Sequence, residues 1–401
     1  MLILIGAAPC VGAEKKGMTR DEPTAGTGRL DSLFNAEWSQ NWSYGGKGIE
    51  YNPADSDTAL WIGLRFQTRY DTRPGDLRTP ADLISSGDQG FDLRRGRIKG
   101  GGDLFRDWLH VYLEHDFASD TFLDYRVTTT WRGFLSFRIG QWKSEFNRER
   151  VDSSGRQQLV ERSITNYWFT VDRQRGIATS ARFARGTIAD TRVYLERLSG
   201  LGLGNNFESD AGLWLGRVMW NPSGTQLPYS QSALVRHDKP VSSIAVAMID
   251  GRSPHTSFSS SGGGNLPGFT TGDFDLRQYL FETAVHYRGF AWQQELHVKR
   301  IRDRESGLER EIAGGYAQLG VFMDQLTEFW SPNVEVVGRF AIVDPDRDRA
   351  SDTQTEWTLG LNWFFHGHRN KLTADYSWLD FDDPLAGESG NRFRLQWELS
   401  L

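Results

Sequence analysis

The chain has 401 residues, of which 13 % are aromatic and 43 are glycine. This composition is too aromatic for a disordered chain and too rich in glycine for a helical protein. The formal net charge of −6 argues against a nucleic-acid-binding protein, and the lack of any run of eighteen apolar residues excludes a protein that crosses a membrane with helices.

The N-terminal residues 1–13 are apolar and end in the small residues Val11-Gly12-Ala13, as a secretory signal peptide does. The usual positively charged start is missing, so we expect a truncated signal. Cys10 is the single cysteine and would leave with the signal, and a mature chain without cysteine has no disulfide and no thiolate nucleophile. Residues 14–57, rich in Gly, Ser and Asn, are expected to form a lead-in or plug segment before a barrel over 58–401.

From residue 58 onward, apolar and polar residues alternate in segments of about ten residues, separated by Gly, Asp, Asn and Pro clusters. In the last segment Phe393, Leu395 and Trp397 share one face, and Arg392 and Arg394 share the other. The pattern predicts sixteen strands, at 58–70 and near 91–100, 108–117, 122–131, 134–143, 174–183, 187–198, 210–220, 241–250, 276–288, 290–301, 311–323, 333–343, 354–365, 371–380 and 392–401. Residues 231–238 compete with 241–250 for one of them.

The connections between these strands alternate in length. Those at 131–134, 184–186, 288–290 and 366–368 are short, whereas those at 71–90, 144–173, 251–275, 344–353 and 381–390 are long. The alternation in length predicts short connections at 221–240 and 324–331 as well, but both are longer than a tight turn. Short periplasmic turns and long outer loops are typical of membrane barrels. The sequence therefore predicts an all-β protein, a sixteen-stranded antiparallel transmembrane β-barrel, with residues 14–57 on the periplasmic side.

Three stretches resemble the phosphate-selective porin O/P family: residues 91–100 (FDLRRGRIKG), 137–146 (FRIGQWKSEF) and 159–163 (LVERS). The likeness extends over roughly residues 40–401. It implies a Gram-negative outer-membrane porin, usually a homotrimer, whose third loop folds into the lumen, and whose named members pass phosphate or polyphosphate along a basic ladder. Outer-membrane lipid, lipopolysaccharide and the barrel assembly machinery are the expected partners, with no cofactor or metal. Leu401 stands where outer-membrane barrels commonly end in Phe.

Charged side chains on the inward face would decide what such a barrel passes, because an outward Arg at the bilayer midplane costs about 2–4 kcal/mol. The predicted inward basic set is Arg65, Arg69, Arg95, Arg97, Lys99, Arg126, Arg138, Arg182, Arg192, Arg217, Lys299, Arg339, Lys371, Arg392 and Arg394. The predicted inward acidic set is Glu114, Asp116, Asp124, Glu196, Glu282, Glu295, Glu335, Asp375 and Glu398. The lumen is thus expected to be positive inside an acidic chain.

Arg95, Arg97 and Lys99 are the sharpest local signal, because alternate residues on one strand project from one face about 6–7 Å apart. They would form a ladder for anions, or alternatively pair with Glu114 and Asp116 and only hold the wall together. The predicted pore-lining and anion-binding residues are Arg95, Arg97, Lys99, Arg126, Arg138, Lys143, Arg156, Arg162, Arg217, Lys299 and Arg339.

The loop at 144–173 allows more than one interpretation. Arg156 and Arg162 are candidate anion contacts, since a guanidinium matches phosphate or carboxylate with two hydrogen bonds. Glu161 would instead neutralise Arg162, or the whole loop would be a solvated outer loop.

No catalytic motif is present, and no enzyme activity is expected. The acidic run that begins at Asp344 resembles a calcium loop, but Arg349 and Thr355 stand where an EF-hand needs Gly and Glu. A remaining hypothesis is that this acidic outer loop holds divalent cations near lipopolysaccharide. The leading hypothesis is an anion-preferring porin. The alternatives are a general or organic-acid porin with weak selectivity, and a plugged barrel that serves as an enzyme or adhesin.

Overall fold

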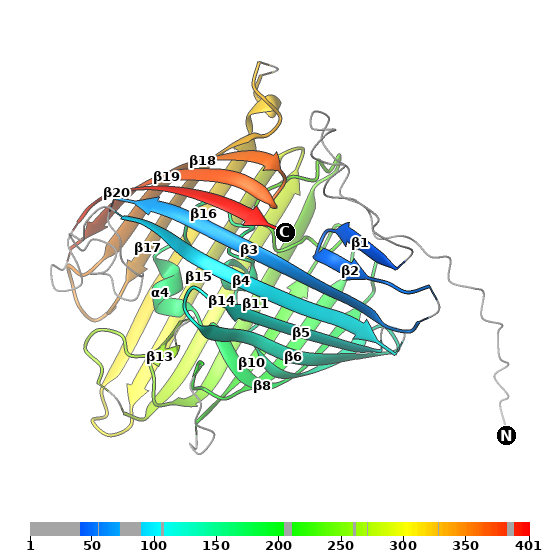
Figure 1. Cartoon of the computed structure of the whole chain (residues 1–401). Coiled ribbons are helices and arrows are strands. Elements are labelled where there is room, and N and C mark those ends of the chain that lie inside the picture. The colour runs from blue at the N-terminus through cyan, green and yellow to red at the C-terminus, as the bar shows by residue number, and fades with distance from the viewer. Residues whose placement is uncertain are drawn as a thin grey trace, which may run out of the picture.

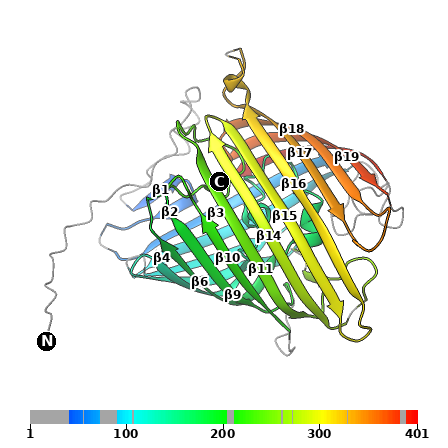
Figure 2. The same ribbon diagram turned by 180° about the vertical axis from the view of Figure 1, so that it is seen from behind.

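The computed structural model describes residues 41–54, 56–72, 90–105, 108–203, 211–259, 262–270, 272–327, 329–382 and 389–401. Within them, sixteen long antiparallel strands follow one another around a closed barrel (Figures 1 and 2). They are β3 (Ala59–Asp71), β4 (Gly90–Leu104), β5 (Leu109–Asp116), β6 (Thr121–Trp131), β7 (Leu135–Lys143), β8 (Arg173–Phe183), β9 (Thr191–Leu198), β10 (Gly212–Trp220), β11 (Val241–Ser253), β14 (Phe274–Tyr287), β15 (Phe290–Asp303), β16 (Glu309–Phe322), β17 (Val334–Asp344), β18 (Gln354–His366), β19 (Asn370–Phe381) and β20 (Gly390–Ser400). All sixteen predicted strands are confirmed, including the one near 241–250.

The barrel closes where the last strand pairs with the first. Arg394 of β20 lies opposite Asp71 of β3, and Ser400 lies opposite Arg65. Beyond the end of β20, the backbone of Leu401 exchanges two hydrogen bonds of 2.8 Å with Leu64. Closure pairs the first and last strands of the barrel wall, and a bilayer would not tolerate an open edge there.

A short hairpin continues the sheet below the end of β20. Its strands are β1 (Trp42–Gly45) and β2 (Gly48–Tyr51), and Ile49 of β2 lies opposite Ile62 of β3. The C-terminal part of the predicted segment 14–57 is therefore an extension of the sheet beside the start of β3. The predicted signal peptide at 1–13 lies outside the described residues.

Alternation around the closed wall separates lipid-facing from inward-facing side chains. In β18, Trp357, Leu359 and Leu361 are exposed on the outer face, whereas Glu356 and Thr358 are buried inside. The same period of two runs through β14, β15 and β19. Apolar side chains thus cover the outer face, and polar side chains meet inside the wall.

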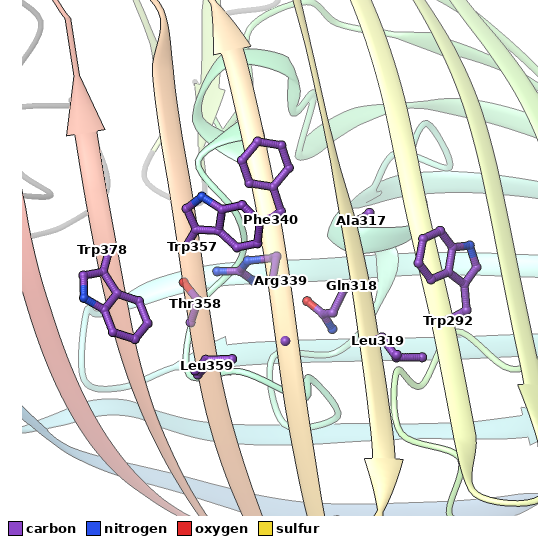
Figure 3. Close-up of a pocket in the computed structure, with 11 residues that line it drawn as sticks. Trp292, Ala317, Gln318, Leu319, Arg339, Phe340, Trp357, Thr358, Leu359 and Trp378 are labelled. Carbon is purple, nitrogen blue, oxygen red and sulfur yellow. The ribbon is translucent and has the colours of Figure 1, made fainter.

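A hollow in the outer face shows this apolar covering directly. It has a volume of about 550 Å³ and lies over β15 to β19 between Trp292 and Trp378 (Figure 3). Its floor lies at Gly338, where an added Cβ would meet only Leu359, at 3.7 Å. Trp357 and other outward side chains of these strands line it, so the hollow belongs to the lipid-facing surface and not to the lumen.

One predicted strand begins later than expected. The strand predicted at 187–198 starts at Thr191, because residues 184–190 form a turn in which Thr187 N donates to Ala184 O and Asp190 N donates to Thr187 O. The predicted competitor at 231–238 is not a strand but lies in the connection between β10 and β11.

Among the described residues, helical structure is confined to short pieces. These are α3 (Arg148–Val151), α4 (Thr165–Phe169) and the 3₁₀ turn η1 (Met323–Gln325). In the described part of the chain no helix is long and apolar enough to cross a membrane. The small hairpin of β12 (Ser257–Ser259) and β13 (Gly262–Gly264) lies in the long connection after β11.

The alternation predicts a position-dependent cost for a charge on the outer face. Leu359 is 57 % exposed near the middle of β18, and we expect Leu359→Arg to lower the free energy of unfolding by about 2–4 kcal/mol. Leu326, which is 62 % exposed in a turn beyond the end of β16, is the control, and Leu326→Arg should change it by no more than about 0.5 kcal/mol. Denaturant unfolding in lipid measures both, and equal losses would contradict the lipid-facing assignment.

Candidate functional site

The connection between β7 and β8, residues 144–172, is bonded to inward-facing side chains on the far wall. Asn147 Nδ2 donates to Glu295 of β15 at 3.0 Å, and Ile164 N donates to Glu356 of β18 at 2.8 Å. Val160 N donates to Asp375 of β19 at 2.9 Å. Most of the segment is buried, and α4 lies within the outline of the barrel (Figure 1). These bonds join the loop to strands that lie across the lumen from its own.

Apolar packing fills one side of the interior. Trp168 and Phe169 of α4 belong to a buried cluster with Leu213 of β10, Ile312 of β16 and Val343 of β17. Phe258, Leu266 and Phe269, from the connection after β11, join the same cluster. Close packing of this kind leaves no room for water or a solute. This apolar cluster thus packs the long loop against strands of the wall that include β10, β16 and β17.

A second segment enters from the turn side. In the connection at 221–240, Ser232 Oγ donates to Glu335 at 2.8 Å, and Tyr229 OH donates to Glu145 at 3.1 Å. Gln158 N of the long loop donates to Gln231 at 2.9 Å. The sequence marked this connection only as unusually long. The structure shows that the extra length packs against the inward-facing wall and the long loop.

A polar cavity of about 190 Å³ lies between the long loop and strands β4 to β8. It is lined by Arg97, Lys99, Tyr112, Glu114, Asp124, Arg126, Arg138, Lys143, Glu145, Val151, Ser153 and Arg173. Six of these side chains are cationic and three are carboxylates, so the cavity carries an excess of positive charge. Low-dielectric walls focus the field of such charges on any ion inside.

Five of the eleven predicted anion-binding residues line this cavity. Arg97 donates to Glu114 at 2.8 Å and to Asp116 at 2.7 Å, which is the wall-holding alternative for that residue. Lys99 has no hydrogen-bond or ion-pair partner among the described residues, and its ammonium group faces the cavity.

The other three predicted anion-binding residues in the cavity have weaker or backbone partners. Arg126 donates to Asp124 at 3.1 Å and lies 4.2 Å over the ring of Tyr112. Arg138 donates to Glu145 at 3.4 Å, and Lys143 Nζ donates to the carbonyl of Asp152 at 2.8 Å. Of these five, Lys99 therefore has the charge least compensated by a direct contact.

Four of the predicted anion contacts bond to the backbone of the long loop, and their role as anion contacts stays a prediction. Each is buried and donates to a loop carbonyl: Arg162 to Glu149 O at 2.9 Å, Arg217 to Phe146 O at 2.7 Å, Lys299 to Trp168 O at 3.1 Å, and Arg339 to Glu161 O at 2.9 Å. Buried carbonyls need such donors. The charge of these four residues and their place in the alternation of inward and outward side chains could not distinguish them from cations that face water.

The remaining predicted residues are Arg156 and Arg95. Arg156 is exposed, and its carbonyl accepts from Gln231 N at 3.3 Å. Arg95 donates to Gln67 at 2.9 Å and to Glu161 at 3.1 Å. The sequence suggested that Glu161 neutralises Arg162. In the structure Glu161 pairs with arginines of the wall instead.

Two inward cations, Arg94 and Arg173, are absent from the predicted inward set. Gln67 of β3 lies opposite Arg95 but Thr68 lies opposite Leu93, so Arg94 is the extra residue of a β-bulge. The bulge brings the Nε of Arg94 to 3.8 Å from Glu161. Arg94 and Arg95, two adjacent arginines, interrupt the alternation at this point, and this interruption could have indicated the bulge from the sequence.

The ionisation of loop carboxylates depends on these neighbours. Burial opposes charge on Asp172, but Arg150 and Arg173 outweigh it and lower its pKa to about 2. Burial and the nearby Glu295 raise the pKa of Glu149 to about 7. In the described part of the chain, no cluster of three or more His, Cys, Asp or Glu side chains is suited to a metal ion.

A closed barrel with a lipid-facing exterior and a charged interior defines an outer-membrane β-barrel channel. The family model for phosphate-selective porin O and P matches residues 62–399, and the chain belongs to this family. The protein is thus an outer-membrane porin of a Gram-negative cell envelope. A sequence comparison with curated proteins returned no match.

Solved structures share the fold at low sequence identity. OmpT of Vibrio cholerae superposes with a TM-score of 0.55 at 9 % identity, covering 87 % of this chain and 99 % of OmpT. A trimer form of that OmpT gives 0.53 at 9 % identity, with 86 % and 99 % covered. An anion-selective porin from Comamonas acidovorans gives 0.54 at 10 % identity, with 86 % and 100 % covered. At 9–10 % sequence identity, these comparisons show a similar fold alone.

Because Arg217 holds the long loop, we expect its replacement to lower the stability of the protein. Arg217 donates to Glu282 as well as to the loop, and Arg217→Met would remove the ion-pair partner of that buried carboxylate, at a cost of about 3–5 kcal/mol. Arg302, which is 62 % exposed and 3.4 Å from Glu309, is the control, and Arg302→Met should cost no more than about 1 kcal/mol. Denaturant midpoints measure both. A wild-type midpoint for Arg217→Met would contradict the role.

Proposed function

We propose that this porin passes small hydrophilic solutes by passive diffusion along the β4 to β8 side of its lumen and prefers anions. The observation that carries the proposal is the cavity, whose lining contains six cations and three carboxylates. Phosphate or polyphosphate is the proposed solute class, and the description of the family supports it. The anion-selective porin from Comamonas acidovorans, which has the same fold, agrees with an anion preference.

A general or organic-acid porin with weak selectivity is the second candidate. It is favoured by the direct pairing of Arg97 with Glu114 and Asp116, and of Arg173 with Asp124, because paired charges attract ions less. Neutral replacement of Arg95, Arg97 and Lys99 together separates the two candidates. Little change in ion preference would favour the weakly selective channel. A lack of any conductance in planar bilayers would instead favour a plugged barrel that acts as an enzyme or adhesin.

The proposed functional unit is a homotrimer. A fold relative described as a trimer form supports it. Native mass spectrometry of the protein extracted in mild detergent should give three times the mass of one chain, and a monomer mass would contradict it. The expected contacts with lipopolysaccharide and the barrel assembly machinery stay predictions.

Lys99 gives the sharpest test of the anion preference. Two unit charges about 7 Å apart in water interact by about 0.6 kcal/mol, or about threefold in local ion concentration. We therefore expect Lys99→Met to lower the anion-to-cation permeability ratio about threefold, and Lys99→Arg to leave it near the wild-type value. Reversal potentials in a potassium chloride gradient measure the ratio. A cation preference in the wild type, or equal effects of both variants, would contradict the proposal.

A further inference from the structure

The hollow between Trp292 and Trp378 runs obliquely across the lipid-facing wall (Figure 3). Trp292 lies two residues from the turn-side end of β15, and Trp378 lies three residues from the loop-side end of β19. Between them, Leu319, Gly338 and Leu359 are neighbours in register on β16, β17 and β18. Tryptophan favours the level of the lipid headgroups. The hollow therefore extends through the hydrocarbon region from near one headgroup level toward the other.

Aromatic rings form the sides of the hollow around a floor of backbone. The floor at Gly338 has no side chain, and the rings of Phe340 and Trp357 pack beside it with 4.5 Å between their centroids. The ring of Trp378 packs edge-on against Tyr376, with 4.8 Å between their centroids. Such ring pairs stabilise one another. The resulting volume of about 550 Å³ lies within the range of about 300–1,000 Å³ that is usual for ligand pockets.

An acyl chain is the occupant that this hollow fits. The hollow is continuous with the apolar outer face of the barrel, which borders the hydrocarbon of the bilayer. An empty hollow would forfeit dispersion contacts, and an apolar hollow does not hold ordered water. Two convex barrels would touch along a narrow strip, whereas the hollow spans five strands, from β15 to β19. A second copy of the chain would therefore leave most of it unfilled.

A cation lies just beyond the turn-side end of the hollow. Arg288 is exposed in the turn between β14 and β15, and its guanidinium lies 5.4 Å over the ring of Tyr287. Tyr287 is opposite Phe290, and the next outward side chain along β15 is Trp292. Outward side chains on one strand follow one another at about 6–7 Å. The guanidinium thus lies at the level of the headgroups, where it can bind a lipid phosphate through charge-assisted hydrogen bonds.

We propose that this face of the barrel binds one phospholipid of the periplasmic leaflet, with an acyl chain in the hollow and the phosphate at Arg288. An acyl chain gains no hydrophobic free energy when it leaves other lipids, so such a site depends on close packing and on polar contacts of the headgroup. The hollow supplies the packing, and Arg288 supplies the polar contact. The site lies on the outside of the wall, so the proposal does not depend on which solute passes through the lumen.

A glycine replacement tests the acyl-chain part of the site. Gly338→Leu fills the hollow, and we expect it to raise the concentration of phosphatidylethanolamine that half-saturates the protein about tenfold, which equals 1.4 kcal/mol. Native mass spectrometry of the purified protein in mild detergent, with added phosphatidylethanolamine, measures this concentration for the first bound lipid. Gly216→Leu is the matched control, because Gly216 faces outward on β10 and an added Cβ there would meet nothing within 4 Å. It should bind the lipid as the wild type does.

An arginine pair tests the phosphate part. Arg132 has the same place in the turn between β6 and β7 that Arg288 has in its own turn, with its guanidinium 4.6 Å over the ring of Trp131, but it lies away from the hollow. We expect Arg288→Gln to weaken lipid binding about threefold, as for an exposed charge pair, and Arg132→Gln to leave it unchanged. Equal effects of the two replacements would overturn the placement of the phosphate.

The lipid site is overturned if the wild type retains no phospholipid, or if Gly338→Leu binds it as the wild type does. It is also overturned if Gly338→Leu reduces the mass of the assembly to that of one chain and leaves lipid binding unchanged, because a second copy then occupies the hollow. Both leucine variants should keep the chloride conductance of the wild type in planar bilayers, since both side chains point away from the lumen. An unchanged conductance also confirms that the variants are folded.

Discussion

Charged side chains that leave water need opposite charges or hydrogen-bond partners, and this requirement organises the interior of the barrel. Removing one member of a buried pair is costly because the other stays charged and unsolvated. Each loop segment that enters the lumen therefore meets a partner already present on the wall. Arg217 and Arg339 donate to loop carbonyls, and Asp375 accepts from the loop backbone. The wall and the long loop are complementary in charge and in hydrogen bonding.

This complementarity divides the lumen into two parts with different roles. On the β10 to β17 side, apolar packing around Trp168 and Phe169 joins the loop to the wall. On the β4 to β8 side, cations outnumber carboxylates around the polar cavity. The same loop thus packs against the wall in the apolar cluster and lines the polar cavity. Lys99, which has no direct ion pair among the described residues, lies on this second side.

The alternation of the sequence was sufficient to predict the strands and the fold class, because side-chain direction in a strand has a strict period of two. It also predicted which charges face inward. It failed at Arg94, where a bulge shifts the register, and at Thr191, where a turn delays the strand. Which of the inward cations donate to carbonyls of the long loop was not predictable. Arg162 and Lys99 look alike in sequence, and only the path of the loop separates them.

The central claim is that solutes pass along the β4 to β8 side, and thiol accessibility tests it most directly. Ser153 lines the polar cavity, whereas Ser243 of β11 is buried on the inner wall with 1 % exposure. In a chain without Cys10, an anionic methanethiosulfonate reagent should reduce the current through Ser153→Cys irreversibly and leave Ser243→Cys unchanged. Block of Ser243→Cys with no effect on Ser153→Cys would contradict the account.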